Sequence, residues 1–84
     1  MEYLFTFVNT YAAIKAQDLL TTQTIPFNVM PLPSSLGDSC GICFRIKAPD
    51  LTTVRQVLQA NRVAITQIYQ INVVAGKKRY QPWN

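Results

Sequence analysis

Hydrophobic residues recur along this chain with two different periods, and together these predict four strands and two helices. Residues 3–8 are aromatic and β-branched and are nearly apolar on both faces, which is typical of an inner strand. From there to about Thr22, apolar residues recur at helical spacing, and Asn9 or Thr10 offers a side chain that caps the helix start. We therefore expect a central strand followed directly by a helix.

The remaining elements follow in the order strand, strand, helix, strand. Residues 25–30 form a strand, and Pro26 places it at a sheet edge because proline cannot donate a ladder hydrogen bond. After a loop rich in Pro, Ser and Gly, residues 40–47 resume as a strand with one apolar face. Asp50 caps the second helix, and residues 64–74 form the last strand.

This order of elements predicts an α+β fold of the ferredoxin-like βαββαβ type. Right-handed crossovers give a four-stranded antiparallel sheet in the order 4-1-3-2, with both helices on one face. We expect residues 1–74 to form this domain and residues 75–84 to form a basic and aromatic C-terminal tail.

The excess of positive charge lies near the C-terminus, where two aromatic residues follow it. Much of the net charge of +4 lies in Lys77, Lys78 and Arg79, and a terminal basic run is usually solvated. The aromatic residues that follow, Tyr80 and Trp83, either stack on bases or pair back as a short strand through a turn at residues 75–76. We favour packing or a protein contact over nucleic acid.

Composition narrows the class of protein further. With 49% hydrophobic and 14% charged residues, the chain is globular and somewhat apolar for a small monomer, so we expect a homodimer. It has no 18-residue apolar run and no basic leader, so we expect neither a membrane span nor a signal peptide, and a cytoplasmic location.

Cys40 is the candidate reactive residue, in the sequence Ser39-Cys40-Gly41. The chain contains no histidine, so this thiol cannot belong to a thiol-imidazole catalytic pair. A reactive thiol here must instead be stabilised by backbone N–H groups, a helix start or a cation, which suits sulfur relay better than hydrolysis. Two cysteines without histidine also cannot complete a zinc site in one chain, and we expect no metal site.

Cys40 and Cys43 match a Cys-x-x-Cys pattern, but an extended strand disfavours a disulfide between them. Three steps along a strand span about 10 Å, beyond the roughly 7 Å Cα separation that a disulfide tolerates. Pairing would need a bulge at Gly41. We interpret Cys43 as structural or as part of a subunit interface.

The expected topology places Cys40 at the end of the sheet where the first helix begins. Asn9, Thr10 and Arg62 belong to the same end. The positive end of the helix dipole and Arg62 would favour the thiolate, and Asp38 would oppose it. The alternative is that Cys40 is a small buried hydrophobic residue.

Several motifs in order resemble the Putative Se/S carrier protein-like family. They are an opening strand with a Thr cap, an Ala-rich helix, an Ile-Pro strand, a Pro-x-Pro element and a Ser-Cys-Gly motif at the third strand, here residues 5–10, 12–20, 25–26, 31–33 and 39–42. The likeness covers about residues 3–70. The chain departs from the family pattern at Ser34, where a basic residue is expected, and at Cys43, where a small apolar residue is expected.

The resemblance implies a carrier that holds sulfur or selenium on Cys40 as a persulfide or selenosulfide. Its partners would be donor and acceptor proteins, with no cofactor. Gly41 would keep the surroundings of the thiol open, and Asn9 with Thr10 would cap the helix that supports the anion. Such a protein is a carrier rather than a turnover enzyme.

Two other functions remain open. One is a non-catalytic ferredoxin-like regulatory module that binds ligands or proteins and needs no reactive thiol. The other is an RNA-binding accessory domain that uses Arg45, Lys47 and the basic tail.

Overall fold

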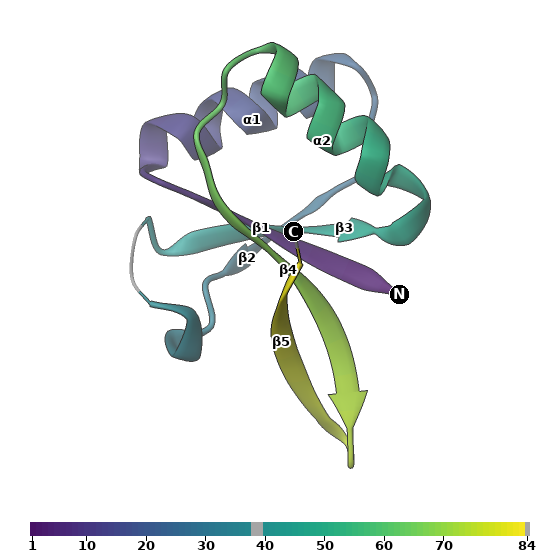
Figure 1. Ribbon diagram of the computed structural model, residues 1–84. Coiled ribbons are helices and arrows are strands. Elements are labelled where there is room, and N and C mark those ends of the chain that lie inside the picture. The colour runs from purple at the N-terminus through teal and green to yellow at the C-terminus, as the bar shows by residue number, and fades with distance from the viewer. Residues whose placement is uncertain (38–39, 84) are drawn as a thin grey trace.

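The computed structural model describes residues 1–37 and 40–83, and these form one sheet with helices above it (Figure 1). In chain order the elements are β1 (Glu2–Phe7), α1 (Thr10–Thr22), β2 (Asn28–Pro31), a 3-10 turn η1 (Ser34–Leu36), β3 (Ile42–Lys47), a 3-10 turn η2 (Ala48–Asp50), α2 (Leu51–Ala60), β4 (Ile65–Val74) and β5 (Lys77–Trp83).

The sheet is antiparallel and has the order β2-β3-β1-β4-β5. The central position expected for the first strand is confirmed, because β1 lies between β3 and β4. The edge position expected for the second strand is confirmed as well. The expected four-stranded sheet is wrong, because the described residues contain a fifth strand, β5.

A two-residue turn brings β5 back onto β4. Ala75 and Gly76 both have positive φ, 51° and 76°, as the tight hairpin turns that match the strand twist require. Pairing then runs from Val74 opposite Lys77 to Ile68 opposite Trp83. The alternative in which the last residues pair back as a strand is therefore confirmed.

Both helices cover the same face of the sheet, as Figure 1 shows. Alternate residues of β1 point toward them, and α1 presents small alanines that allow close approach to the sheet. Phe7 and Phe44 meet edge to face in this layer, with ring centroids 4.8 Å apart. The helix-side core consists of Tyr3, Phe5, Phe7, Ala12, Ala13, Ala16, Leu20, Phe44, Ile46, Leu51, Val54, Leu58, Val63 and Ile68.

A smaller apolar cluster occupies the opposite face of the sheet. Leu4, Cys43 and Ile71 are its buried members. The segment between β2 and β3 contributes to it through Leu32 and Leu36, so this loop covers part of the second face. Met30, Tyr69 and Tyr80 complete the cluster as partly buried neighbours.

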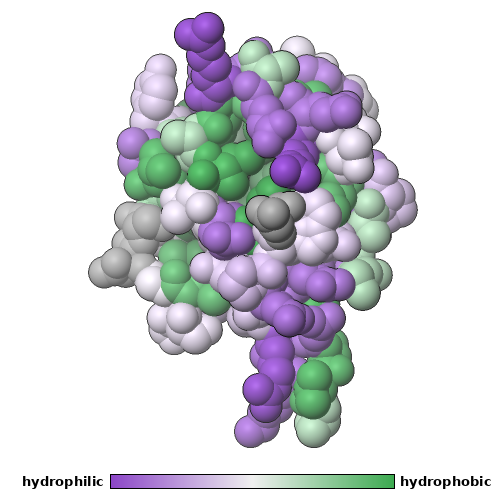
Figure 2. All heavy atoms as spheres, viewed as in Figure 1, coloured by the Kyte–Doolittle hydropathy of each residue, from purple (hydrophilic) through white to green (hydrophobic). Residues whose placement is uncertain are grey.

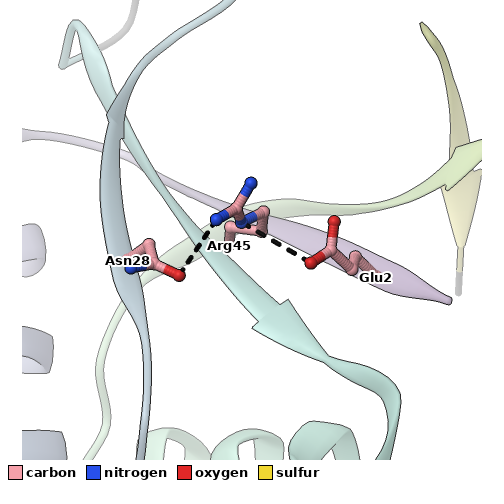
Figure 3. A network of polar contacts seen from close by, with 3 residues as sticks. All are labelled: Glu2, Asn28 and Arg45. Carbon is pink, nitrogen blue, oxygen red and sulfur yellow. Dashed lines mark hydrogen bonds and ion pairs between the residues drawn. The ribbon is translucent and has the colours of Figure 1, made fainter.

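Arg45 links three strands on this second face (Figure 3). Its guanidinium donates a hydrogen bond to Asn28 Oδ1 at 3.2 Å, and its Nε lies 3.7 Å from Glu2 Oε2. Both charged side chains are about one-third exposed, at 32% and 34%, so solvent screens the pair and its contribution to stability is modest.

The helix starts differ from one another in how they are capped. Asn9 caps α1 as expected, because its Oδ1 accepts a 2.8 Å hydrogen bond from the Ala12 N–H. Asp50 also stands at the N-cap position of α2, but its side chain makes no capping hydrogen bond. The expected side-chain cap is therefore wrong: a 3-10 turn containing Pro49 leads into the helix instead.

The second strand is shorter than expected. The Ile25 N–H donates to the Leu20 carbonyl at 2.9 Å, which closes the end of α1 and keeps residue 25 out of the sheet. Strand β2 consequently begins at Asn28.

Candidate functional site

The sequence around Cys40 lies at one end of the sheet, directly before β3. In the antiparallel pairing of β1 with β3, Thr6 is opposite Cys43, so β1 ends where β3 begins. The Val8 N–H donates to the Ala64 carbonyl at 3.2 Å, which brings the turn between α2 and β4 to this end too. Figure 1 shows the starts of α1 and β3 on the same side of the molecule.

The side chain of Cys40 is partly buried and packs against the helix-side core. Its thiol donates a hydrogen bond to the Ile42 carbonyl at 3.1 Å, which folds the side chain along its own backbone. The thiol is therefore neither sealed in the interior nor fully solvated.

Gly41 makes this local conformation accessible. Its φ is +78°, in the left-handed region that L side chains rarely adopt. A Cβ added at this position would meet no heavy atom within 4 Å, so the requirement for glycine comes from the backbone and the space above it is open. The Gly41 carbonyl accepts a 2.9 Å hydrogen bond from the Leu32 N–H, which fixes the turn against the preceding loop.

The other predicted site residues contribute in different ways. Asn9 Oδ1 is engaged by the Ala12 N–H, and Thr10 is the exposed first residue of α1. Arg62 is exposed in the turn after α2, with a φ of +58°. Ser39 and Asp38 lie outside the described residues. The structure thus brings Asn9, Thr10 and Arg62 to the end of the sheet that carries Cys40.

Cys43 has a very different environment. It is completely buried in the cluster on the far face, where its thiol donates to the Pro31 carbonyl at 3.7 Å. Burial, and to a lesser degree the nearby charge of Cys40, raises the pKa of Cys43 to about 11. Such a thiol is protonated at neutral pH and serves packing.

Chemically, this arrangement offers one partly exposed sulfur beside an open glycine turn, backed by a rigid strand and an apolar core. A nucleophile in such a position can accept an atom or group from another protein that approaches from solvent. The buried second thiol is not placed to resolve a disulfide with it, because the two sulfurs pack on opposite faces of the sheet.

Comparison with known protein families shows which family the chain belongs to. The model of the family described as Putative Se/S carrier protein-like matches residues 2–70, so the chain belongs to this family. The resemblance to this family is therefore confirmed. The match ends within β4, and β5 lies outside it. The comparisons with curated proteins and with solved structures each find no match.

Two features of the site region escape sequence reasoning. The Ile42 carbonyl that accepts the hydrogen bond from the Cys40 thiol is a backbone group, and only the adjacent glycine signals an unusual turn. The second feature is the groove beside the β4–β5 hairpin, which includes Asn72 and Gln81. The turn at residues 75–76 was the sequence signal that could have indicated it.

The described helices include none that is both long and apolar enough to cross a bilayer.

Proposed function

We propose that this protein carries sulfur or selenium on Cys40, as a persulfide or selenosulfide, and relays it between enzymes. The observation that carries the proposal is the contrast between the two thiols in a member of this family. Cys40 is partly exposed beside an open turn, whereas Cys43 is fully buried with a raised pKa.

The transfer step needs no outside oxidant. The sulfur of Cys40 attacks the terminal sulfur of a persulfide on a donor protein, and the donor S–S bond breaks as a new S–S bond forms on Cys40. The donor thiolate leaves with the bonding electron pair and takes up the proton that Cys40 has given up. Delivery to an acceptor repeats the exchange in reverse, and a terminal selenium atom follows the same course.

The surroundings of Cys40 support such an exchange. The attacking sulfur must approach in line with the S–S bond that breaks, and the partial exposure of Cys40 next to the open space at Gly41 favours such an approach. A terminal persulfide is anionic, and the start of α1, capped by Asn9, lies at this end of the sheet with its positive dipole end. We include Ser39, Thr10 and Arg62 in the proposed site as groups that support the anion.

The proposal also covers the type of fold, the partners, the oligomeric state and the cellular location of the protein. Strands β2, β3, β1 and β4, with two helices on one face, support a ferredoxin-like domain to which β5 is added. We propose that donor and acceptor proteins meet the Cys40 end, that the protein forms a homodimer, and that it acts in the cytoplasm without a cofactor.

The test is sulfur loading followed by intact mass spectrometry. The full chain is incubated with a cysteine desulfurase and cysteine, and a mass increase of one sulfur atom that cyanide removes is expected. Cys40→Ser should lose this adduct and Cys43→Ala should keep it. Incubation with a selenocysteine lyase and selenocysteine tests whether Cys40 also accepts selenium.

Equal adducts on the two variants, or none on the unmodified protein, would contradict the carrier proposal. In that case the non-catalytic binding module is the better account. Circular dichroism of both variants shows whether each retains the fold.

A further inference from the structure

The C-terminal hairpin carries most of the net charge of this chain. Residues 1–70 contain five Lys or Arg and four Asp or Glu, whereas residues 71–84 contain Lys77, Lys78 and Arg79 and no acidic residue. The segment also lies beyond the region that matches the family. Because these cations belong to an ordered strand, the sequence argument that a basic tail is merely solvated does not apply to them.

The cations line a groove between the hairpin and the 3-10 turn η1. The groove has a volume of about 720 Å³, and Leu36 contributes to its wall from the turn. The hairpin side provides the three cations with Tyr80, Asn72 and Gln81. Side chains alternate along a strand, so Lys78 and Tyr80 lie on the hairpin face that carries Ile71, and Arg79 and Gln81 lie on the face that carries Asn72. No carboxylate of the described residues lines it. Figure 2 shows strongly hydrophilic atoms along one strand of the projecting hairpin.

The basic surface extends from the hairpin toward the body of the sheet. Lys78 also lines a second groove, of about 450 Å³, together with Lys47 at the end of β3. Glu2 is the one acidic residue among the described residues that line this second groove, and it is paired with Arg45. An extended polyanion would therefore find cations along a path longer than the hairpin itself.

We propose that the hairpin groove binds single-stranded nucleic acid. Lysine and arginine side chains of β5 would contact phosphates, and the partly buried Tyr80 offers a ring on which a base can stack. Asn72 and Gln81, already joined by a 3.2 Å hydrogen bond, present amide groups suited to base edges. A nucleotide chain that follows β5 would therefore meet cations on both faces of the hairpin, the ring of Tyr80 on one face and the two amides on the other.

Other occupants fit the groove less well. An acidic peptide that adds a strand to β5 would meet Pro82, which has no N–H to donate to it. A second copy of this chain would bring its own lysines against Lys77 and Lys78. A duplex has paired and stacked bases, so it would leave Tyr80 without a stacking partner.

The binding test uses the full chain and a fluorescently labelled single-stranded oligonucleotide of mixed sequence. Fluorescence anisotropy gives the binding constant over a range of salt concentrations. Lys78→Gln/Arg79→Gln should weaken binding and make the slope of log K against log salt shallower by about 0.7 for each lost phosphate contact. Lys15→Glu lowers the net charge by the same two units at an exposed position of α1 and should leave the slope unchanged.

Stacking is tested separately at Tyr80. Tyr80→Leu should weaken binding by about five- to a hundredfold, and Tyr80→Phe should bind nearly as well as the unmodified protein. Circular dichroism confirms that the leucine variant keeps the fold. If it does not, the Lys78→Gln/Arg79→Gln and Lys15→Glu variants, which change exposed residues, still decide the question.

Three results would overturn the proposal. They are equal weakening in Lys78→Gln/Arg79→Gln and in Lys15→Glu, equally tight binding of a duplex of the same sequence, and tighter binding of polyglutamate than of the oligonucleotide. Cys40→Ser should bind the oligonucleotide normally, so failure of this inference and failure of the carrier proposal are distinguishable.

Discussion

Cys40 and Cys43 lie three positions apart in the sequence, yet their sulfurs pack on opposite faces of the sheet. Cys40 contacts the helix-side core, and Cys43 is buried in the cluster on the far face. Gly41 turns the chain before β3 begins, but it does not bring the two side chains together. The Cys-x-x-Cys pattern therefore marks two thiols in separate environments.

The raised pKa of Cys43 predicts a loss of stability at alkaline pH. A thiol with a pKa of 9.0 in the unfolded chain and about 11 in the folded protein holds its proton more tightly when folded. Between these two values the unfolded state binds fewer protons, so the free energy of unfolding falls as the pH rises. The slope reaches at most about 1.4 kcal/mol per pH unit.

Urea unfolding across this pH interval measures the effect, with Cys43→Ala as the control that removes the thiol. Tyrosines and lysines titrate in the same range in both proteins. The unmodified protein should therefore lose stability faster than the variant as the pH rises. If the free energy of unfolding fell in parallel with pH for the two proteins, burial would not raise the pKa of this thiol.

The backbone at Gly41 predicts a stability cost that depends on the shape of the new residue. Gly41→Ala should destabilise the protein by about 1–2 kcal/mol, because the left-handed conformation is unfavourable for L residues. No clash adds to this, since a Cβ meets no atom within 4 Å. Gly41→Asn should cost less, because asparagine tolerates this region.

Gly76 provides a matched control, because its φ of +76° and its open surroundings are nearly the same. Thermal unfolding should show similar losses for Gly41→Ala and Gly76→Ala. Only the change at Gly41 should alter the rate at which iodoacetamide modifies Cys40. Identical alkylation rates in both variants would show that Gly41 does not affect access to the Cys40 thiol. This result would weaken the role proposed for Gly41.

Sequence patterns predicted most elements because local periodicity and packing agree there. The residues of β1 are apolar on both faces, and Asn9 is a favourable cap, so tertiary structure has no reason to override them. The start of β2 was missed because the end of α1 uses the Ile25 N–H. Helix capping competes with strand pairing there, and no composition signal shows which one prevails.

The fifth strand shows a different difficulty. Lys77, Lys78 and Arg79 have the composition of a solvated tail, and Pro82 disfavours a strand. Pairing with β4 depends on the turn at residues 75–76 and on a tryptophan that packs into the core beside it. At the candidate site, the sequence predicted the end of the sheet at which Cys40 lies, whereas the contact with the Ile42 carbonyl could not be predicted because it involves a backbone group.

The packing of Trp83 predicts that β5 is held by its last residue. The ring meets Tyr3 edge to face with centroids 5.5 Å apart, and the Arg55 guanidinium lies 5.3 Å from the ring centroid. An aromatic pair and a cation–π contact each contribute roughly 0.5–1.5 kcal/mol. Trp83→Ala should therefore destabilise the protein by about 1–3 kcal/mol. Arg55→Ala should have a smaller effect, because it removes only the cation–π contact.

Urea unfolding followed by circular dichroism gives these differences, and tryptophan emission reports on the ring itself. Loss of the cation in Arg55→Ala should shift the emission, while Arg55→Lys should preserve most of the contact. Trp83→Phe should keep β5 in place, since a phenylalanine ring can still pack on Tyr3. A Trp83→Ala variant as stable as the unmodified protein would mean that the β4–β5 ladder alone holds the hairpin.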